Sequence, residues 1–256
     1  MRLYILDLDG TLYRGNEVLP YAVETVSELR RRGALIRFLT NNSGSTRNSY
    51  LEKLTRMGFA PLDLEIYSSG IGTARYCVEV GIKKVFAVGE AGLVRTLREG
   101  GLDVVNAGPD AIVFANTKDR AEAVVAGIHR SFTYPILNGA LQQVMSSARL
   151  IATNADATYP VEDGRVQPGA GAIVASLEKC SGVEAFVVGK PNPFLIEMIL
   201  RDANVGAEDC LVVGDRYETD IESGKRAGCE THLVLTGVTQ TALEGQRWSA
   251  DLRGLL

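Results

Sequence analysis

The chain has 256 residues, of which 46% are hydrophobic and 23% are charged, and its formal net charge at pH 7 is −4. This composition is typical of a globular protein that buries one large core or two smaller ones. Because there is no excess of basic residues to bind a phosphate backbone, nucleic acid is not an expected partner.

The four cysteines are scattered without CxxC spacing, which indicates neither a zinc site nor a disulfide framework and suits a reducing compartment. The apolar segment at residues 3–8 is too short for the core of a signal peptide, and no apolar stretch approaches the length of a membrane span. The sequence therefore predicts a cytoplasmic protein with no membrane partner.

Strand and helix patterns alternate in the first third of the chain. The apolar run at residues 3–8 ends in carboxylates and glycine, as a buried parallel strand with polar groups at its C-terminal end would. An apolar stripe of Ala22, Val26 and Leu29 predicts a helix over residues 22–32. Further strands are predicted over 34–39 and 66–70, and further helices over 47–57 and 71–80. This alternation predicts an α/β fold with a doubly wound, Rossmann-like parallel sheet, whose ligands lie beyond the carboxyl ends of the strands.

The middle of the chain has a different character. Its strand candidates, at residues 84–88, 111–114 and 150–153, alternate with helical segments, but few acids or hydroxyls gather at their ends. The pattern of the first third, apolar strands that lead into polar or glycine residues, returns in strand candidates at residues 185–189, 210–214 and 231–235. An insertion within one core explains this return better than two domains in series. The predicted organisation is therefore a discontinuous core at residues 1–81 and 184–256 with an inserted domain at residues 82–183.

Asp7 and Asp9, at the end of the first predicted strand, are the first candidates for chemistry. Alternate residues of a strand point to the same face, so both carboxylates would overlook the ligand crevice. Two close carboxylates repel each other unless a cation or a shared proton relieves them, and oxygen ligands favour Mg²⁺ over zinc. The alternative, a solvated pair of aspartates in a loop, fits poorly with the apolar run that precedes them.

Three more charged candidates follow later strands. Asp215 and Asp220 come directly after the strand at residues 210–214, and form a second acidic cluster in an equivalent place. Lys190 follows the strand at residues 185–189 and precedes two prolines, Pro191 and Pro193, that restrict the chain. The plain structural alternatives are a helix N-cap for Asp220 and an exposed surface position for Lys190.

Thr40 and Asn41 offer hydroxyl and amide donors at the end of the second strand, which suits phosphate oxygens, although a helix-capping turn is the alternative. The two histidines, His129 and His232, share no metal-ligand spacing and are interpreted as structural.

Four short motifs stand in order along the chain: Asp7-Leu-Asp-Gly-Thr11, Leu39-Thr-Asn-Asn-Ser43, Gly189-Lys-Pro-Asn-Pro193 and Gly214-Asp-Arg-Tyr-Glu-Thr-Asp220. Together they resemble the four motifs of the haloacid dehalogenase superfamily of phosphatases, in the branch that includes NagD-like proteins and 4-nitrophenylphosphatases. The resemblance runs almost end to end. It implies that the inserted domain is an α/β cap, whose signature matches Thr153-Asn-Ala-Asp156 and Pro168-Gly-Ala-Gly171. It also implies that the protein is a phosphoric monoester hydrolase.

The resemblance assigns a role to each acid of the motifs. Asp7 would attack the phosphorus and become an aspartyl phosphate, while Asp9 would protonate the leaving oxygen and later deprotonate the hydrolytic water. Mg²⁺ would be held by the Asp7 carboxylate, the Asp9 backbone carbonyl and the Asp215 carboxylate. Asp220 would complete the metal site through a water molecule or as a partner of the direct ligands.

The resemblance also assigns the phosphate-binding residues. Thr40 and Lys190 would bind the phosphoryl oxygens, with Gly10, Asn41 and Asn192 as further substrate-binding residues. Positive charge is needed because an anionic nucleophile approaches an anionic substrate, and one pair of unit charges about 4 Å apart is worth on the order of 4 kcal/mol at an effective dielectric constant near 20.

A small-molecule phosphate ester is the expected substrate. Members of the superfamily that cleave carbon-halogen bonds lack an acid at the position of Asp9, and a cap that excludes bulk water favours metabolites over phosphoproteins. Sugar phosphates, phosphoglycolate, nucleotides and pyridoxal phosphate all stay open, and His129 departs from the cap pattern of the family. A homodimer through the cap also stays open, with apolar Val124, Ile128 and Phe132 as contributors unless they belong to the core.

Three alternative functions remain. A phosphomutase or phosphotransferase would pass the phosphoryl group to an alcohol instead of water. A phospho-acceptor signalling module also combines acids, threonine and lysine on a parallel sheet, but the long insertion and Asp9 argue against it. A binding protein that has lost its chemistry is disfavoured because no acid of the motifs is missing.

Overall fold

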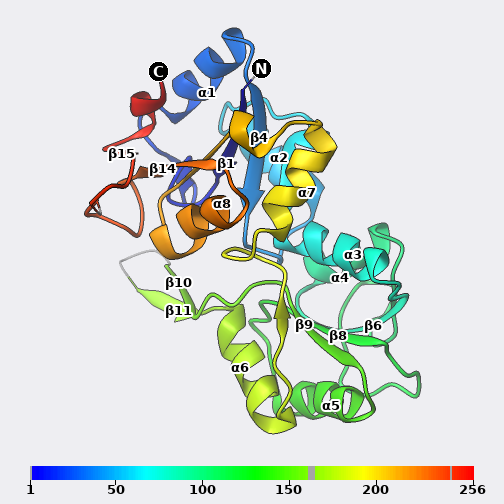
Figure 1. The fold of residues 1–256 in the computed structure, drawn as a ribbon. Coiled ribbons are helices and arrows are strands. Elements are labelled where there is room, and N and C mark those ends of the chain that lie inside the picture. Colours follow the sequence, from blue (N-terminus) through cyan, green and yellow to red (C-terminus); the bar gives the residue numbers. More distant parts are fainter. Residues whose placement is uncertain (1, 161–164, 243) are drawn as a thin grey trace. The chain divides into compact units, whose positions relative to one another are not determined.

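The computed structural model describes residues 2–160, 165–242 and 244–256, and the chain divides into two compact units (Figure 1). The first unit comprises Met1–Thr40, Asn48–Tyr67 and Lys190–Leu256, and the second comprises Asn41–Arg47 and Ser68–Gly189. Because three separate stretches of sequence build the first unit, its sheet depends on contacts between residues that are far apart along the chain.

The first unit is built on a six-stranded sheet with the order β15-β14-β13-β1-β4-β5. The strands are β1 (Leu3–Asp7), β4 (Leu35–Thr40), β5 (Ile66–Ser68), β13 (Cys210–Gly214), β14 (Glu230–Val234) and β15 (Trp248–Ser249). The α-helices are α1 (Ala22–Arg31), α2 (Arg47–Arg56), α7 (Phe194–Ala203) and α8 (Glu222–Arg226), and a hairpin of β2 (Tyr13–Arg14) and β3 (Glu17–Val18) follows β1. β1 pairs in parallel with β4 on one side and with β13 on the other, so the carboxyl ends of these three strands share one edge.

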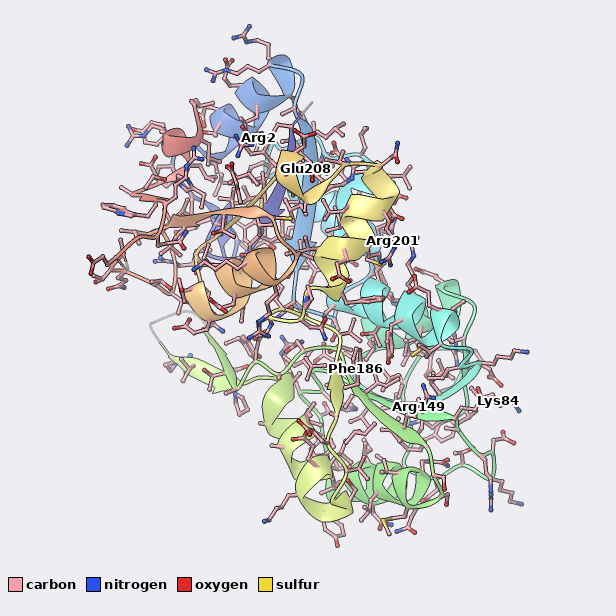
Figure 2. The ribbon with its side chains drawn as sticks, viewed as in Figure 1. Arg2, Lys84, Arg149, Phe186, Arg201 and Glu208 are labelled. Carbon is pink, nitrogen blue, oxygen red and sulfur yellow. The ribbon has the colours of Figure 1, made fainter. Side chains whose placement is uncertain are left out.

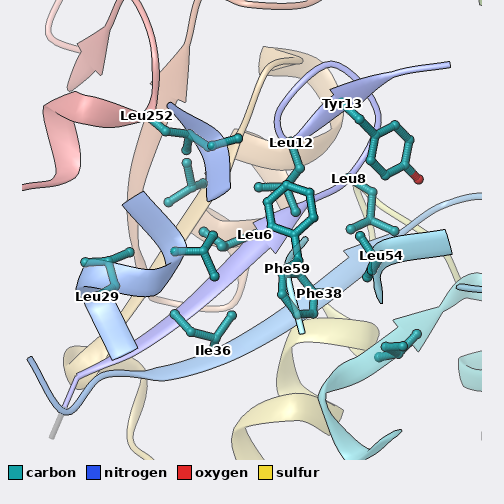
Figure 3. Packing of buried hydrophobic residues seen from close by; sticks show 14 of the residues in the cluster. Leu6, Leu8, Leu12, Tyr13, Leu29, Ile36, Phe38, Leu54, Phe59 and Leu252 are labelled. Atoms are coloured by element: carbon teal, nitrogen blue, oxygen red, sulfur yellow. The ribbon is translucent and has the colours of Figure 1, made fainter. Parts of the chain in front are cut away.

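Apolar side chains of the sheet and of α1 form the core of the first unit. The predicted stripe of α1 is buried, and Leu29 belongs to the same cluster as Ile36 of β4 and Leu6 of β1 (Figure 3). Phe38 and Phe59 pack edge to face in this cluster, with ring centroids 6.4 Å apart. Each such side chain contributes about 2 kcal/mol relative to an exposed one, which fixes the strands that carry the polar groups.

The second unit has its own parallel sheet, with the order β12-β9-β8-β6-β7. The strands are β6 (Lys84–Val88), β7 (Asp103–Val104), β8 (Ala123–Ala126), β9 (Arg149–Ala152) and β12 (Phe186–Val187), with a separate antiparallel hairpin of β10 (Thr158–Pro160) and β11 (Val166–Pro168). Its helices are α3 (Ser69–Glu79), α4 (Ala91–Glu99), α5 (Tyr134–Met145) and α6 (Ala170–Ser181).

The central strands of this sheet, β6, β8 and β9, are buried along most of their length. Lys84 and Arg149 occupy the exposed first positions of β6 and β9, and all following residues of these strands are buried (Figure 2). Val124 and Ile128 are buried and Phe132 packs against the same core, so these three residues are core residues of the unit.

The predicted strand at residues 111–114 is wrong. Ala111 adopts a left-handed backbone conformation with φ of 67°, and the Ile112 N–H bonds to the Asp110 carboxylate at 3.1 Å, so the segment turns instead of extending. Its one bridge pairs Ala107 with Val113. The position beside β6 belongs instead to β8, a more continuously buried run.

The parallel-sheet α/β fold predicted from the sequence is confirmed. The second unit includes α3, which packs on α4, and therefore begins earlier than the predicted insertion at residues 82–183. The assignment of residues 82–183 as a cap stays a prediction. In the part of the chain that the structure describes, no helix has both the length and the apolar character that crossing a membrane requires.

Candidate active site

Three carboxylates meet at the carboxyl edge of the first sheet. Asp7 is the last residue of β1, Asp215 directly follows β13, and Asp220 lies in a short π-helical turn, Tyr217–Ile221. Each offers one oxygen, and these three oxygens all lie within 4.8 Å of one another. The parallel pairing of β1 with β13 explains the meeting, because it brings the ends of both strands to one edge.

Lys190 bridges two of these carboxylates. Its Nζ donates to Asp7 Oδ1 at 2.6 Å and to Asp220 Oδ1 at 2.5 Å, and the side chain is only 3% exposed. Burial favours the neutral amine, but attraction by Asp220 and Asp7 outweighs it and raises the pKa of Lys190, so the ammonium stays charged. The surface alternative considered for this lysine is therefore wrong.

Burial also changes the titration of the acids. It raises the pKa of Asp7 well above its ordinary value, and the nearby Asp220 and Asp215 charges add to this effect while Lys190 opposes it. Burial and the charge of Asp220 raise the pKa of Asp215 to about 7. The single ammonium of Lys190 cannot balance the charges of three ionised aspartates, so the ionised cluster carries an excess of negative charge where little water can solvate it.

This donor set fits a divalent cation. The cluster offers carboxylate oxygens from Asp7, Asp215 and Asp220, and their excess negative charge is what a hard cation would neutralise. Asp220 is 2% exposed, and its Oδ2 accepts the Arg216 N–H at 3.0 Å, so it is not the helix N-cap considered as its alternative.

Asp9 lies outside this cluster. Its side chain is exposed, although the surrounding protein removes enough hydration to raise its pKa, an effect that Lys53 and Arg14 oppose. Its backbone forms a bridge with Tyr13, at the start of the hairpin. The exposed position is compatible with a group that exchanges protons with a substrate or with water.

Two of the predicted phosphate-binding residues lie near strand ends: Thr40 ends β4, and Gly10 lies just beyond β1. Thr40 is the buried last residue of β4, one position beyond the partner of Asp7 in the sheet. Gly10 turns the chain after Asp9 with φ of 89°, and its N–H donates to the Tyr13 carbonyl at 2.8 Å. The Gly10 N–H therefore already has a partner within the loop.

The two predicted asparagines make structural contacts. Asn41 belongs to the second unit, where its side chain donates to the Asp156 carboxylate at 3.2 Å and its carbonyl accepts the Asn154 side-chain N–H at 2.8 Å. Asn192 lies in the first unit, and its Oδ1 accepts the Phe194 N–H at 3.0 Å at the start of α7.

The segment Thr236-Gly237-Val238, which resembles the C-terminal core segment of the same family branch, makes contacts in the site that the sequence did not predict. The Val238 N–H donates to Asp215 Oδ2 at 2.6 Å, and the Thr236 hydroxyl donates to the Gly10 carbonyl at 2.6 Å. The resemblance indicated this segment but not its contacts, because a backbone donor has no side-chain signature.

Comparison with known families and proteins gives a consistent result. A model described as haloacid dehalogenase-like hydrolase matches residues 4–103, and a related model described as HAD-hydrolase-like matches residues 187–252. The 5'-nucleotidase YutF of Bacillus subtilis is 34% identical over 240 residues, which cover 93% of this chain and 88% of that protein. Glycerol-3-phosphate phosphatase of Rattus norvegicus is 34% identical over 254 residues, covering 92% of this chain and 79% of that protein.

Solved structures agree with these matches. The p-nitrophenyl phosphatase from Archaeoglobus fulgidus superposes with a TM-score of 0.89 at 34% identity, covering 99% of this chain and 97% of that chain. The glycerol phosphate phosphatase from Mycobacterium tuberculosis, solved in complex with magnesium, gives a TM-score of 0.86 at 30% identity, covering 99% of this chain and 76% of that one. The carboxylate cluster thus stands in a chain that resembles these proteins over nearly its whole length, and the chain belongs to the haloacid dehalogenase-like hydrolases.

Proposed function

We propose that this protein is a Mg²⁺-dependent phosphatase that hydrolyses small-molecule phosphate monoesters through an aspartyl phosphate on Asp7. The observation that carries the proposal is the meeting of Asp7 with Lys190, Asp215 and Asp220 at one sheet edge. The names of the similar proteins support phosphate ester hydrolysis and include nucleotide, glycerol phosphate and nitrophenyl phosphate substrates.

In the proposed first half-reaction, the Asp7 carboxylate forms a bond to phosphorus as the bond between phosphorus and the ester oxygen breaks. Asp9 gives its proton to the leaving oxygen, and its raised pKa favours the protonated form that this step requires. Lys190, hydrogen-bonded to Asp7, holds the nucleophile in place and offsets the repulsion between carboxylate and phosphate. Thr40 adds a hydroxyl donor for a phosphoryl oxygen.

In the second half-reaction, Asp9 takes a proton from water, which attacks the phosphorus and releases inorganic phosphate from Asp7. The same carboxyl group therefore acts first as acid and then as base, which returns the enzyme to its starting protonation state.

Mg²⁺ is the proposed cofactor. Asp7, Asp215 and Asp220 provide carboxylate oxygens, of which those of Asp215 and Asp220 come from buried residues, and the backbone carbonyl of Asp9 is the further ligand implied by the resemblance. When bound, the ion would supply positive charge that screens the nucleophile and the phosphoryl oxygens from each other. The magnesium complex of the Mycobacterium tuberculosis protein supports this choice. A cytoplasmic location and a homodimer through the cap stay predictions.

The test is hydrolysis of p-nitrophenyl phosphate with and without Mg²⁺. We expect Asp7→Asn to lower kcat by at least about 10³-fold, because it removes the nucleophile. Asp103→Asn makes the same chemical change at an exposed position of β7 and should keep wild-type activity.

A panel of sugar phosphates, nucleoside monophosphates and glycerol phosphates then ranks substrates. If the wild type released no phosphate at any Mg²⁺ concentration, the proposal would be wrong. Transfer of phosphate to an added alcohol would indicate a phosphotransferase, and a stable phosphorylated form without turnover would indicate a signalling module.

A further inference from the structure

The segment Thr236–Val238, which follows β14 after Leu235, contacts the carboxylate of Asp215. The Val238 N–H donates to Asp215 Oδ2 at 2.6 Å, and the N–H of Thr239 donates to the Asp215 backbone carbonyl at 3.0 Å. Side chain and backbone of Asp215 are thus both fixed by one short stretch of chain. Asp215 is 3% exposed, so water does not compete for these hydrogen bonds.

The same segment is tied to the loop after β1. The Thr236 hydroxyl donates to the Gly10 carbonyl at 2.6 Å, and the Arg14 guanidinium donates to the Thr236 carbonyl at 2.7 Å. Asp7 ends β1 just before the first of these loops, and Asp215 stands in the loop after β13, so the segment after β14 connects the two loops beside these carboxylates. Each of these contacts lies within the first unit.

Two glycines leave room for the Asp215 carboxylate. A Cβ atom on Gly237 would lie 1.9 Å from Asp215 Oδ2 and 2.4 Å from Cγ. A Cβ atom on Gly10 would lie 2.5 Å from the same Oδ2 and 2.6 Å from Cγ. The carboxylate therefore packs against bare backbone at Gly10 and at Gly237, and a side chain at either position would displace it.

This packing matters for a metal ligand. Fixing Oδ2 by the Val238 N–H fixes the plane of the carboxylate, and so the position of both its oxygens relative to Asp7 and Asp220. A ligand that is fixed before the ion arrives does not have to be ordered when the ion binds, which favours binding.

We propose that Thr236, Gly237 and Val238 form a positioning element for the metal ligand Asp215, and that this element couples the loop after β1 to the loop after β13. The inference rests on the proposed function, because it assigns these residues to the Mg²⁺ site. None of the three side chains is proposed to touch Mg²⁺ or substrate. Gly237 acts by its lack of a side chain, Val238 by its backbone N–H and Thr236 by its hydroxyl.

The experiment compares Mg²⁺ affinity in the full-length wild type, Gly237→Ala, Thr236→Val and Thr236→Ser. Affinity is measured directly by the Mg²⁺-dependent rise in Tm and by Mn²⁺ binding in electron paramagnetic resonance, and separately as the Mg²⁺ concentration for half-maximal p-nitrophenyl phosphate hydrolysis. Thr241→Val is the matched control, since this threonine is exposed and lies five residues further along the chain.

We expect Gly237→Ala and Thr236→Val to weaken metal binding about 10-fold to 100-fold, as loss of partners that orient metal ligands does. Thr236→Ser keeps the hydroxyl and should bind metal as the wild type does. At saturating Mg²⁺, kcat should recover more fully than the metal affinity, with KM for substrate little changed.

Wild-type metal affinity in both Gly237→Ala and Thr236→Val would overturn the inference while leaving the proposed function intact. A wild type that binds no divalent ion would instead overturn the proposed function. If Gly237→Ala does not fold, the pair Thr236→Val and Thr236→Ser still decides: equal affinity in these two variants contradicts the role of the hydroxyl.

Discussion

His232 is a buried histidine in β14 whose ring nitrogens have very different surroundings. Its Nε2 lies 2.7 Å from Ser249 Oγ, and that hydroxyl donates its own proton to the Asp251 carbonyl at 2.6 Å. Nε2 must therefore carry the proton in the neutral ring. Nδ1 is buried and has no hydrogen-bond partner among the described residues, so a second proton there would have no acceptor.

This arrangement predicts a pH-dependent loss of stability. Burial, with a smaller effect from Arg247, lowers the pKa of His232 from 6.5 to about 4. Protonation of His232 favours the unfolded chain, because the unfolded chain binds this proton more readily. The folded state therefore loses no stability from His232 above pH 6.5, and it loses stability progressively as the pH falls from 6.5 toward 4. The loss is on the order of 3 kcal/mol.

Urea unfolding of the wild type and His232→Gln between pH 7.5 and pH 4.5 tests this effect, because glutamine keeps an N–H for Ser249 but does not titrate. The free energy of unfolding of the wild type should fall more steeply with acid than that of the variant. Parallel curves would show that His232 does not contribute, since the other acids are common to both proteins.

At the scale of single residues, the sequence located the charged groups of the cluster but not the contacts that fix them. For Lys190 a surface position, and for Asp220 a helix N-cap, are the alternatives to a place in the site. Only the pairing of β1 with β13, which are far apart in sequence, decides between these alternatives, because it brings the site residues together. The Val238 N–H could not be predicted, because any residue except proline supplies the same donor.

At the scale of elements, helices and strands near the site were predicted to within a few residues. The helix predicted over 22–32 is α1, Ala22–Arg31, because its apolar stripe and its terminating glycine are both local signals.

The wrong prediction of a strand at residues 111–114 has a different origin. The Asn106 side chain bonds to both the N–H and the carbonyl of Ala87 in β6, at 2.7 and 2.9 Å, and so occupies hydrogen-bonding groups that a strand would use. No local pattern reveals such competition for a strand partner.

Close packing between elements makes a specific prediction for α5. A Cβ atom on Gly139 would lie 1.9 Å from the Ala115 carbonyl oxygen. Gly139→Ala improves helix propensity by about 1 kcal/mol, but overpacking against backbone typically costs about 1–3 kcal/mol and no side-chain rotation relieves this contact. We expect a net loss of about 1–2 kcal/mol in the free energy of unfolding.

Chemical denaturation measures this loss. Asn138→Ala is the control, because it changes the exposed neighbouring position of the same helix and should be neutral or slightly stabilising. A Gly139→Ala protein as stable as the control would mean that α5 can move away from the Ala115 carbonyl without cost.

At the scale of the whole molecule, the division into two units predicts which sheet the proposed Mg²⁺ would stabilise. All three carboxylates of the cluster belong to the first unit. Mg²⁺ at 100 times its dissociation constant should add about 2.7 kcal/mol to the stability of the folded site. Hydrogen exchange should therefore slow in β1 and β13 when Mg²⁺ is added.

Exchange in β6 and β8 of the second unit serves as the internal reference and should change little. Asp215→Asn should remove the effect of Mg²⁺ on β1 and β13. Equal slowing in both sheets would contradict the assignment of the ion to the cluster.

The parallel pairing of Leu3 with Cys210 has a consequence for how the chain is made. On the ribosome, β1 emerges first but cannot complete the centre of its sheet until β13 has been synthesised. Residues 68–189, which make up nearly all of the second unit, emerge as one continuous block before that point. Pairings between distant residues form slowly because a long loop must close first. The carboxylate cluster is therefore among the last parts of the protein to be assembled, and for most of its synthesis the nascent chain holds Asp7 without Asp215 and Asp220.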